Sequence, residues 1–325
     1  MKIIAELCQN HSGSLDLLLS MADVAAECGA THIKMQHISP YSLAYRPEFE
    51  YLVPANSKDK FHKYRPYQDE FNRLLNLELS SRDCIRFVEH VKALSLVPLT
   101  TCFTYGDLDL IADQGFDEIK LASYDCASYP LVRSATTFFN HIYVSTGATY
   151  FDEISKTASI LQESGKGYSL LHCTTIYPTP FSSINLAKMQ ILKTLAPNIG
   201  FSDHTLSSDQ HCLATKAAIV LGANVIERHF TIFNSDQTKD GPVSITANQL
   251  KDITMFAGSP RPAQLNMLDS LFPEWRSVLV GSEDSLLTHE EIINRSYYRG
   301  RFATPRFKGA YHYLDMIPNW DEALQ

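Results

Sequence analysis

Short apolar runs alternate with amphipathic segments along most of the chain. In the amphipathic segments, apolar residues recur at intervals of three and four, which predicts helices, whereas the short apolar runs predict buried strands. The first six strand–helix pairs are Lys2–Leu7 with Ser14–Cys28, Thr31–Met35 with Ser81–Leu96, Val97–Cys102 with Gly106–Gln114, Glu118–Leu121 with Tyr129–Thr137, His141–Ser145 with Phe151–Ser164, and Tyr168–Leu171 with Asn185–Leu195.

The stretch 198–231 supplies two further strands with an amphipathic run between them, Ser207–Leu221. Ser207 or Ser208 is the expected N-cap of that helix and Gly222 its C′ residue. A last helix is expected near Thr246–Phe256. Eight strand–helix units in series predict an α/β fold, a TIM (β/α)8 barrel with a short C-terminal extension, and a doubly wound open sheet is the alternative.

Two segments depart from this alternation. The connection 37–80 is too long for an ordinary loop between a strand and a helix, and we expect it to form a lid or part of a subunit contact. After Gly281 the pattern weakens, which predicts a catalytic barrel over residues 1–281 and an extension over residues 282–325. The extension carries a basic, aromatic stretch at 294–308, which is expected to pack on the surface or to bind an anion or a partner.

Composition narrows the class of protein. Of 325 residues, 45% are hydrophobic and 20% charged, as in ordinary globular proteins, and the net charge of −8 argues against general nucleic-acid binding. No apolar run approaches the roughly 20 residues that span a bilayer, and the N-terminus lacks the layout of a signal peptide. The seven cysteines include no Cys-x-x-Cys pair. Reduced thiols and a cytoplasmic location are therefore expected.

Every predicted strand is followed by polar residues at its carboxyl end. In a barrel these residues share one cavity, so Lys34 and Lys120 would meet several hydroxyl groups and form a phosphate-sized anion site. His204 and His229 end neighbouring strands and suit a divalent transition ion, although simple hydrogen bonding near the surface is the alternative. Glu6 is either a functional carboxylate or half of a structural ion pair.

Several familiar catalytic patterns are missing from the sequence, which contains no Gly-x-Ser-x-Gly elbow, Walker A loop, Gly-x-Gly-x-x-Gly or His-Glu-x-x-His motif. His172 and Cys173 are adjacent in the chain, so a nucleophile formed by a cysteine and a histidine is conceivable there. Because neighbouring residues on a strand point to opposite faces, we do not expect them to act together.

Several segments together resemble the sialic acid synthase family, collinearly from about residue 2 to residue 300. They are Ile3–Ser14, Ile33–Gln36, Lys120–Ser123, Tyr129–Leu131, Val144–Gly147, Leu171–Pro180, Phe201–Thr205 and Ile226–Thr231. The resemblance implies a TIM barrel, a homodimer, and condensation of phosphoenolpyruvate with an N-acylated hexosamine, similar to N-acetylmannosamine, to give a nonulosonic acid and phosphate.

The resemblance also implies roles for individual residues. A divalent metal, manganese or magnesium, would be held by His204 and His229. Sugar-binding positions would be Gln36, Tyr177 and Asp240, and catalytic positions Glu6, Asp125 and Asp240. The positions expected to bind phosphoenolpyruvate are Lys34, Thr101, Lys120, Ser123, Ser145, Thr175 and Ser202.

The sequence also differs from the family pattern. Tyr124 stands where glycine is usual and would narrow the sugar pocket, and the order of residues around Asp240 is unusual. The family continues into an antifreeze-like domain whose arginine reaches the N-acyl group of the sugar in the partner subunit, and the expectation is that this chain lacks that domain. One residue of the basic tail, Arg295, Arg299, Arg301 or Arg306, could replace that arginine, or a separate antifreeze-like protein could supply it, or the acceptor sugar could carry a different substituent.

Three other interpretations stay open at this point. The same condensation on another sugar aldehyde would give a different keto-deoxy acid. A barrel that needs a partner chain would bind phosphoenolpyruvate without turnover. A Schiff-base aldolase would use a barrel lysine as its nucleophile and would be trapped by borohydride with pyruvate.

Overall fold

The computed structural model describes residues 1–52, 63–283, 286–307 and 309–324. Eight parallel strands pair in chain order, and the sheet closes where β1 pairs with β8. The strands are β1 (Lys2–Cys8), β2 (His32–Gln36), β3 (Val97–Cys102), β4 (Glu118–Leu121), β5 (His141–Ser145), β6 (Gly167–His172), β7 (Asn198–Asp203) and β8 (Val225–His229). The predicted TIM barrel is confirmed, and the open sheet is excluded.

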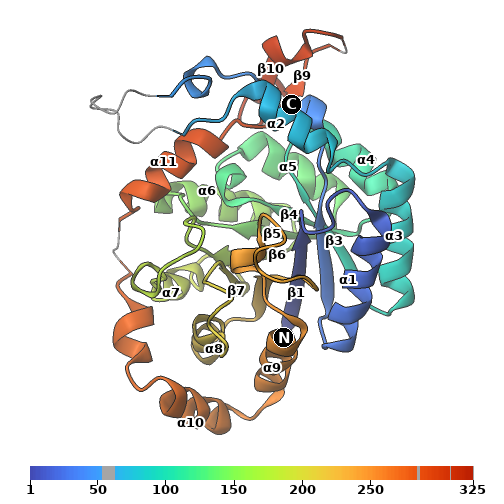
Figure 1. Ribbon diagram of the computed structural model, residues 1–325. Coiled ribbons are helices and arrows are strands. Elements are labelled where there is room, and N and C mark those ends of the chain that lie inside the picture. The colour runs from blue at the N-terminus through green and yellow to red at the C-terminus, as the bar shows by residue number, and fades with distance from the viewer. Residues whose placement is uncertain (53–62, 284–285, 308, 325) are drawn as a thin grey trace.

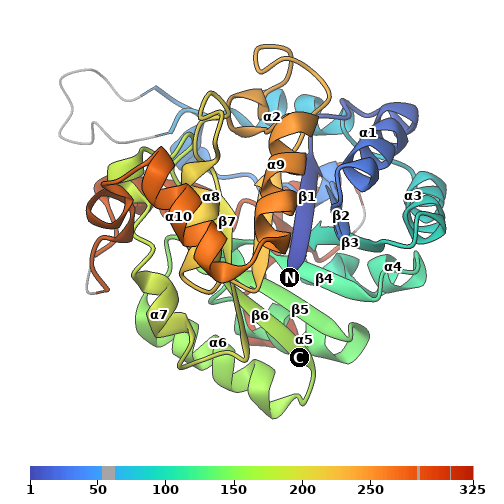
Figure 2. The same cartoon turned by 90° about the horizontal axis from the view of Figure 1, so that it is seen from below.

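Helices surround the closed sheet, as Figures 1 and 2 show. Those that follow strands are α1 (Leu15–Glu27), α3 (Ser81–Ala93), α4 (Leu108–Asp113), α5 (Tyr129–Phe138), α6 (Phe151–Glu163), α7 (Lys188–Leu192), α8 (Leu213–Val220) and α9 (Ala247–Gly258). Three more lie outside that repeat: α2 (Tyr67–Leu75), α10 (Arg261–Leu271) and α11 (His289–Tyr298).

Two hydrophobic layers hold the barrel together. The larger layer lies between the strands and the surrounding helices and includes Leu18, Phe87 and Phe256. The smaller layer fills the inside of the barrel with Ile4, Leu99, Tyr143, Leu171 and Val225. Because side chains alternate across a strand, the residues that lie two positions further along β1, β3, β5 and β8 point into the barrel above this layer. The apolar plug therefore forms the floor of a cavity.

Polar caps fix where several helices begin. The side chains of Ser14 and Thr246 accept hydrogen bonds from backbone N–H groups in the first turns of α1 and α9. The predicted N-cap at Ser207 or Ser208 is wrong, because α8 begins only at Leu213. The carboxylate of Asp209 accepts the N–H of Leu213 at 2.7 Å and takes over the capping role. Gly222 follows the helix at φ +97°, as expected of a C′ glycine.

The connection 37–80 and the C-terminal extension pack together over the carboxyl end of the barrel. Leu43 forms an isolated β-bridge with Phe302, and both belong to a small apolar cluster with Leu74. Figure 1 shows α2, α11 and the ribbon of β9 (Ala303–Pro305) and β10 (Met316–Pro318) at this end. The middle of the expected lid, residues 53–62, lies outside the described residues, and the boundary at residue 281 stays a prediction.

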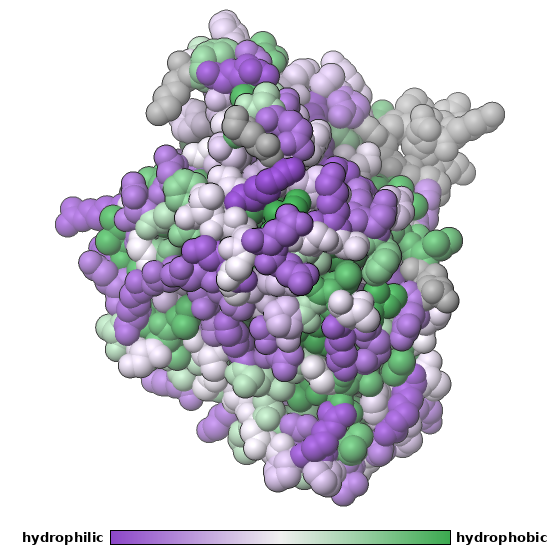
Figure 3. Space-filling model, turned by 180° about the vertical axis from the view of Figure 1, so that it is seen from behind, coloured by the Kyte–Doolittle hydropathy of each residue, from purple (hydrophilic) through white to green (hydrophobic). Residues whose placement is uncertain are grey.

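The surface seen from behind the barrel is mostly hydrophilic, with apolar residues scattered between the polar ones (Figure 3). Among the described helices, none combines the length and the apolar character that a membrane crossing requires.

Candidate active site

A cavity of about 420 Å³ opens at the carboxyl end of the barrel. Its walls come from the ends of β1 to β8, from the loop between β8 and α9, and from α11. Twelve of the fourteen residues predicted for the site line it: Glu6, Lys34, Gln36, Thr101, Lys120, Ser123, Ser145, Tyr177, Ser202, His204, His229 and Asp240. The shared cavity inferred from polar strand ends is therefore present.

The register of the strands explains why these side chains converge. Glu6 on β1 is paired with Lys34 on β2 and with His229 on β8, so an acid, a base and an imidazole lie side by side. Ser202 on β7 is likewise paired with Glu227 on β8. All of these residues line the cavity.

Two buried lysines share carboxylates at the base of the cavity. The Lys120 ammonium lies 3.0 Å from one oxygen of Glu227, which also accepts the Ser202 hydroxyl at 2.8 Å. Lys34 forms a close ion pair with Glu6, lies 3.6 Å from Glu227 and donates to the Thr101 hydroxyl at 2.9 Å. All four charged side chains are at least 96% buried.

Burial and pairing act in opposite directions on these groups. Burial would raise the pKa of Glu227, but Lys120 and Lys34 hold that pKa well below its usual value, so the carboxylate is ionised. Burial lowers the pKa of Lys34 to about 7, and Glu227 opposes this shift. The carboxylates of Glu6 and Glu227 therefore neutralise the two lysines at the base of the cavity until an anionic ligand with more negative charge enters.

A second group of side chains combines nitrogen, sulfur and oxygen donors. Cys8, His229 and Asp240 each offer one possible metal-ligating atom, and these atoms lie within 4.8 Å of one another. The His204 ring lies beside them, with its centroid 5.3 Å from that of His229. Burial lowers the pKa of His204 to about 4, and burial followed by the nearby His204 lowers that of His229 further. Both imidazoles are thus neutral near pH 7, the form that binds a metal.

These residues pass a structural test for a metal site. Nδ1 of His229 is buried and has no hydrogen-bond partner among the described residues. Nδ1 of His204 lies 3.4 Å from the backbone oxygen of Thr174, a contact that would fix the ring and leave Nε2 for an ion. A buried imidazole nitrogen without a partner is costly unless a ligand satisfies it. The donor set therefore fits a divalent cation.

Two predicted site residues lie away from the cavity lining. Asp125 is buried and accepts hydrogen bonds from Ser128 at 3.0 Å and from Asn319 of the extension at 2.9 Å. Burial raises the pKa of Asp125 to about 6. The hydroxyl of Thr175 is also buried, and its backbone oxygen accepts the Asn294 amide at 2.5 Å. In this structure both residues connect the barrel to the extension.

The four arginines of the tail have different surroundings. Arg295 makes a bidentate pair with Glu153, at 2.5 and 2.9 Å, which Arg299 also approaches. Arg306 pairs with an aspartate at the surface. Arg301 is 91% buried and is the one of the four that lines the cavity, where it pairs with Glu70. Arg301 is therefore the tail arginine placed to contact a molecule in the cavity.

His172 and Cys173 separate as the strand geometry predicts. The His172 ring contacts the backbone oxygen of Ile184 at 2.7 Å outside the barrel, whereas the thiol of Cys173 lies 3.1 Å from the hydroxyl of Ser123 beside the cavity. Burial raises the pKa of Cys173 to about 11. A thiol that is protonated near pH 7 and has no contact with the imidazole is unsuited to nucleophilic catalysis.

Three of the lining residues outside the predicted set bear on the chemistry of the cavity. Cys8 follows Glu6 by two positions, so the period of a strand already placed both on one face. Glu227 precedes His229 by two positions on β8, so the same period places these two on one face. Arg73 comes from α2 and donates to Gln9 at 2.5 Å. Nothing in the local sequence indicates its approach, because the long connection 37–80 folds back over the barrel.

Comparisons with known proteins agree with this architecture. The profile of the NeuB family matches residues 21–258. N,N'-diacetyllegionaminic acid synthase of Campylobacter jejuni is 29% identical over 277 residues, covering 83% of this chain and 78% of the relative. Pseudaminic acid synthase of the same species is 30% identical over 254 residues, covering 77% and 70%. The crystal structure of an N-acetylneuraminic acid synthetase from Leptospira borgpetersenii superposes with a TM-score of 0.66 at 25% identity, covering 85% of this chain and 91% of that one.

The chain belongs to the NeuB family, the family of sialic acid synthases that the sequence resembles. Within that family it is an enzyme of the sugar acid synthase type, and its relatives make different nonulosonic acids. Membership of the family does not identify the substrates of this chain. They have to be inferred from the geometry of its cavity.

Proposed function

We propose that the enzyme condenses phosphoenolpyruvate with an N-acylated hexosamine, similar to N-acetylmannosamine, to give a nonulosonic acid and phosphate. The observation that carries the proposal is the placement of two buried lysines beside a cluster of metal-type ligands in one cavity. A strongly anionic substrate and a carbonyl substrate would thus meet at the point where a carbon–carbon bond has to form.

The base of the cavity suits phosphoenolpyruvate. Lys34 and Lys120 supply positive charge, and the surrounding hydroxyls of Thr101, Ser123, Ser145 and Ser202 can donate hydrogen bonds to carboxylate or phosphate oxygens. The hydroxyl of Ser145 is buried without a hydrogen-bond partner among the described residues, as expected of a group that awaits a ligand. Thr175 lies behind this wall and would support it rather than touch the substrate.

The part of the cavity around His204 and His229 would hold the sugar. Gln36, Tyr177 and Asp240 surround the histidines there, and the Tyr177 ring lies 4.2 Å from that of His204. A divalent ion held by His204 and His229 would act as a Lewis acid on the sugar aldehyde. Manganese and magnesium are the candidates that the family resemblance implies.

The bond changes assign a role to Glu6. C3 of phosphoenolpyruvate attacks the aldehyde carbon, whose oxygen takes up a proton to become a hydroxyl, and water adds to C2. The bond between C2 and the bridging phosphate oxygen then breaks, so that C2 becomes a ketone and phosphate leaves with the second proton of the water. The incoming water loses a proton, and Glu6 lies at the base of the cavity beside Lys34 to accept it. Asp125 would act through the extension, because its carboxylate faces Ser128 and Asn319 in this structure.

Arg301 would bind the far end of the sugar. Its placement in the cavity supports a contact supplied by this chain's own tail, and a separate antifreeze-like protein stays the alternative. We expect Arg301→Gln to raise the KM for the sugar while the KM for phosphoenolpyruvate stays the same, and Arg301→Lys to restore part of the loss. Arg306→Gln, which removes an exposed arginine of the same tail, is the matched control.

The decisive assay is phosphate release from phosphoenolpyruvate with a panel of N-acyl hexosamines, with added manganese and after chelation. Release that depends on one sugar and on metal supports the proposal, and Lys120→Gln should abolish it whereas the exposed control Lys193→Gln should not. Trapping of pyruvate on Lys34 or Lys120 by borohydride would instead establish a Schiff-base aldolase. A homodimer and a cytoplasmic location stay predictions.

A further inference from the structure

Cys8 lies at an irregular point of β1. The pairing of β1 with β2 shifts register between Glu6 and Cys8, and Cys8 has a left-handed backbone at φ 47°. Non-glycine residues adopt this conformation rarely, and such residues are concentrated at functional sites. The thiol lines the cavity and is 97% buried.

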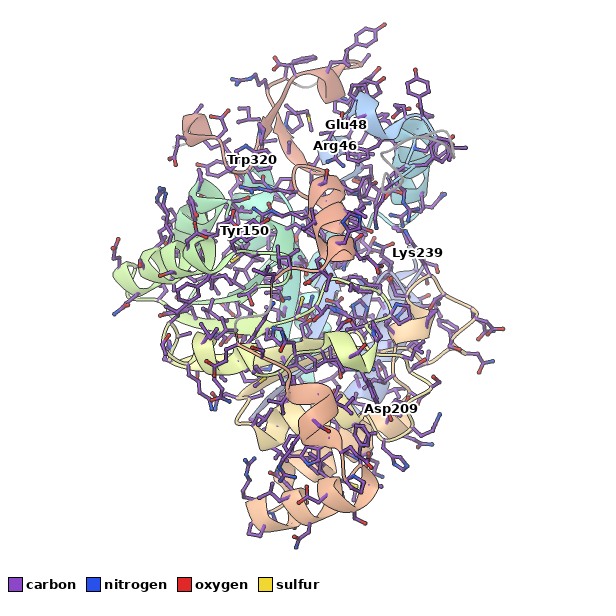
Figure 4. All side chains as sticks on the ribbon, turned by 90° about the vertical axis from the view of Figure 1, so that its left-hand side faces the viewer. Arg46, Glu48, Tyr150, Asp209, Lys239 and Trp320 are labelled. Carbon is purple, nitrogen blue, oxygen red and sulfur yellow. The ribbon has the colours of Figure 1, made fainter. Side chains whose placement is uncertain are left out.

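The partners of the thiol are those of a metal ligand. Its sulfur lies 2.9 Å from a carboxylate oxygen of Asp240, and the amide of Gln36 donates to the sulfur at 3.0 Å. Asp240 belongs to the loop between β8 and α9, on which Lys239 is labelled in Figure 4. A donor that points at the sulfur would stabilise a thiolate, which is the form that binds metals.

An independent observation comes from the neighbouring histidine. Nδ1 of His229 is buried without a partner among the described residues, and His229 contributes a ligand atom to the same group within 4.8 Å of the sulfur and the carboxylate. A buried imidazole nitrogen next to a thiol and a carboxylate indicates a site that can bind a cation, since no contact within the described part of the chain satisfies that nitrogen.

We propose that Cys8 is a direct ligand of the divalent ion, together with His229 and Asp240 and with His204 beside them, and that this site selects zinc or ferrous iron over magnesium. The proposal deepens the proposed function, because the ion occupies the same cavity, but it concerns which metal the chain binds. Thiolate and imidazole suit zinc and iron, whereas magnesium prefers oxygen ligands and retains water.

The charges of the site balance on binding. A divalent ion that binds the sulfur would displace the thiol proton of Cys8 to solvent. The resulting thiolate and the carboxylate of Asp240 together offset both positive charges. His204 and His229 would bind through neutral imidazole nitrogens, which add no charge. The competing arrangement is a magnesium or manganese ion on the two histidines, with Cys8 left as a protonated hydrogen-bonding thiol.

Cobalt(II) titration of the full chain distinguishes these arrangements, because a thiolate bound to cobalt gives an intense near-ultraviolet charge-transfer band. We expect the band in the wild type and in Cys28→Ser, which alters a cysteine at the end of α1 outside the cavity. We expect no band in Cys8→Ser, a loss of zinc affinity of at least about 100-fold, and no displacement of zinc by millimolar magnesium.

A second measurement needs no variant. Zinc should protect Cys8 of the native wild type from alkylation, as seen by peptide mass spectrometry, while magnesium should leave it reactive. Cobalt bound without the band, unchanged zinc affinity in Cys8→Ser, or zinc that fails to protect Cys8 would each overturn the proposal. These readouts require no turnover, so an enzyme that binds zinc through Cys8 but releases no phosphate would contradict the proposed reaction alone.

Discussion

The substitution Glu227→Gln tests the buried charge arrangement at the base of the cavity. Glutamine has nearly the same shape as glutamate and can still accept the Ser202 hydroxyl, so the substitution removes charge without creating a void. Glu227 contacts Lys120 at 3.0 Å and Lys34 at 3.6 Å, and it is 97% buried. Among the described residues it is the one carboxylate paired with Lys120.

The expected loss of stability follows from these contacts. Removing one partner of a buried ion pair leaves an uncompensated charge and costs about 3–5 kcal/mol. Lys34 retains Glu6, so the penalty comes mainly from Lys120. For a chain of this length the entropy of unfolding is about 0.7 kcal/mol per kelvin, which converts the loss to a decrease in Tm of about 4–7 °C.

Ligand binding should reverse the effect. Phosphoenolpyruvate would supply the negative charge that the variant lacks and would no longer compete with Glu227 for the lysines. Ligand at 100 times its Kd stabilises a protein by about 2.7 kcal/mol, and because the variant should bind the anion more tightly, its Tm should rise more than that of the wild type at equal ligand concentration.

Differential scanning fluorimetry with and without phosphoenolpyruvate, at fixed pH and salt, measures both quantities. The control Glu163→Gln makes the same change at an exposed position of α6 and should shift the free energy of unfolding by less than about 0.5 kcal/mol. An unliganded Glu227→Gln variant as stable as this control would refute the buried-charge reasoning. A variant whose Tm rises no more than that of the wild type would refute the anion site.

Three further predictions concern other parts of the barrel. Burial would raise the pKa of Glu118, but His32 and other partners outweigh burial and lower that pKa to about 2. The ionised carboxylate therefore stabilises the fold above about pH 4.5, and this stabilisation is lost as the pH falls towards 2. Acid unfolding of Glu118→Gln should lack this component. Burial raises the pKa of Asp125 to about 6, so ionisation of this carboxyl destabilises the folded state. Above pH 6, Asp125→Asn should therefore unfold at a higher denaturant concentration than the wild type. The difference should disappear below about pH 4, where the carboxyl is protonated in both the folded and the unfolded state. In Gly147→Ala, the added Cβ would lie 2.7 Å from the sulfur of Cys173, so the turn after β5 has to shift. The rate of phosphate release should fall at least about tenfold. An unchanged rate would contradict the close packing at this turn.

Local pattern was sufficient for much of the fold. The alternation of apolar and amphipathic segments located all eight strands, because each strand is buried on both faces and each helix on one. The local pattern failed to locate the N-cap of α8, where more than one side chain can accept a backbone N–H of the first turn. Ser207 resembles an N-cap, yet its N–H is held by the backbone oxygen of Pro242 at 2.8 Å, and Asp209 caps the helix further along the chain.

The candidate site shows the same division. The polar strand ends were sufficient to predict the residues on the inner face, including Lys34, Lys120, His204 and His229. They were not sufficient to separate residues that face the cavity from those that support it, as Asp125 shows by turning towards the extension.

By itself, the sequence determined the eight strands and the polar residues at their carboxyl ends, because strand period and burial are properties of short segments. The closure of the sheet, as opposed to an open sheet, came from the pairing of β1 with β8. Only the tertiary structure decided which charges meet, since the partner of a buried ion is set by the register of strands that are far apart in the chain. It alone brought Arg301 and Arg73 into the cavity, and it alone placed the Cys8 thiol against Asp240, 232 residues away. Contacts of that range depend on the packing of the whole chain, which no local pattern records.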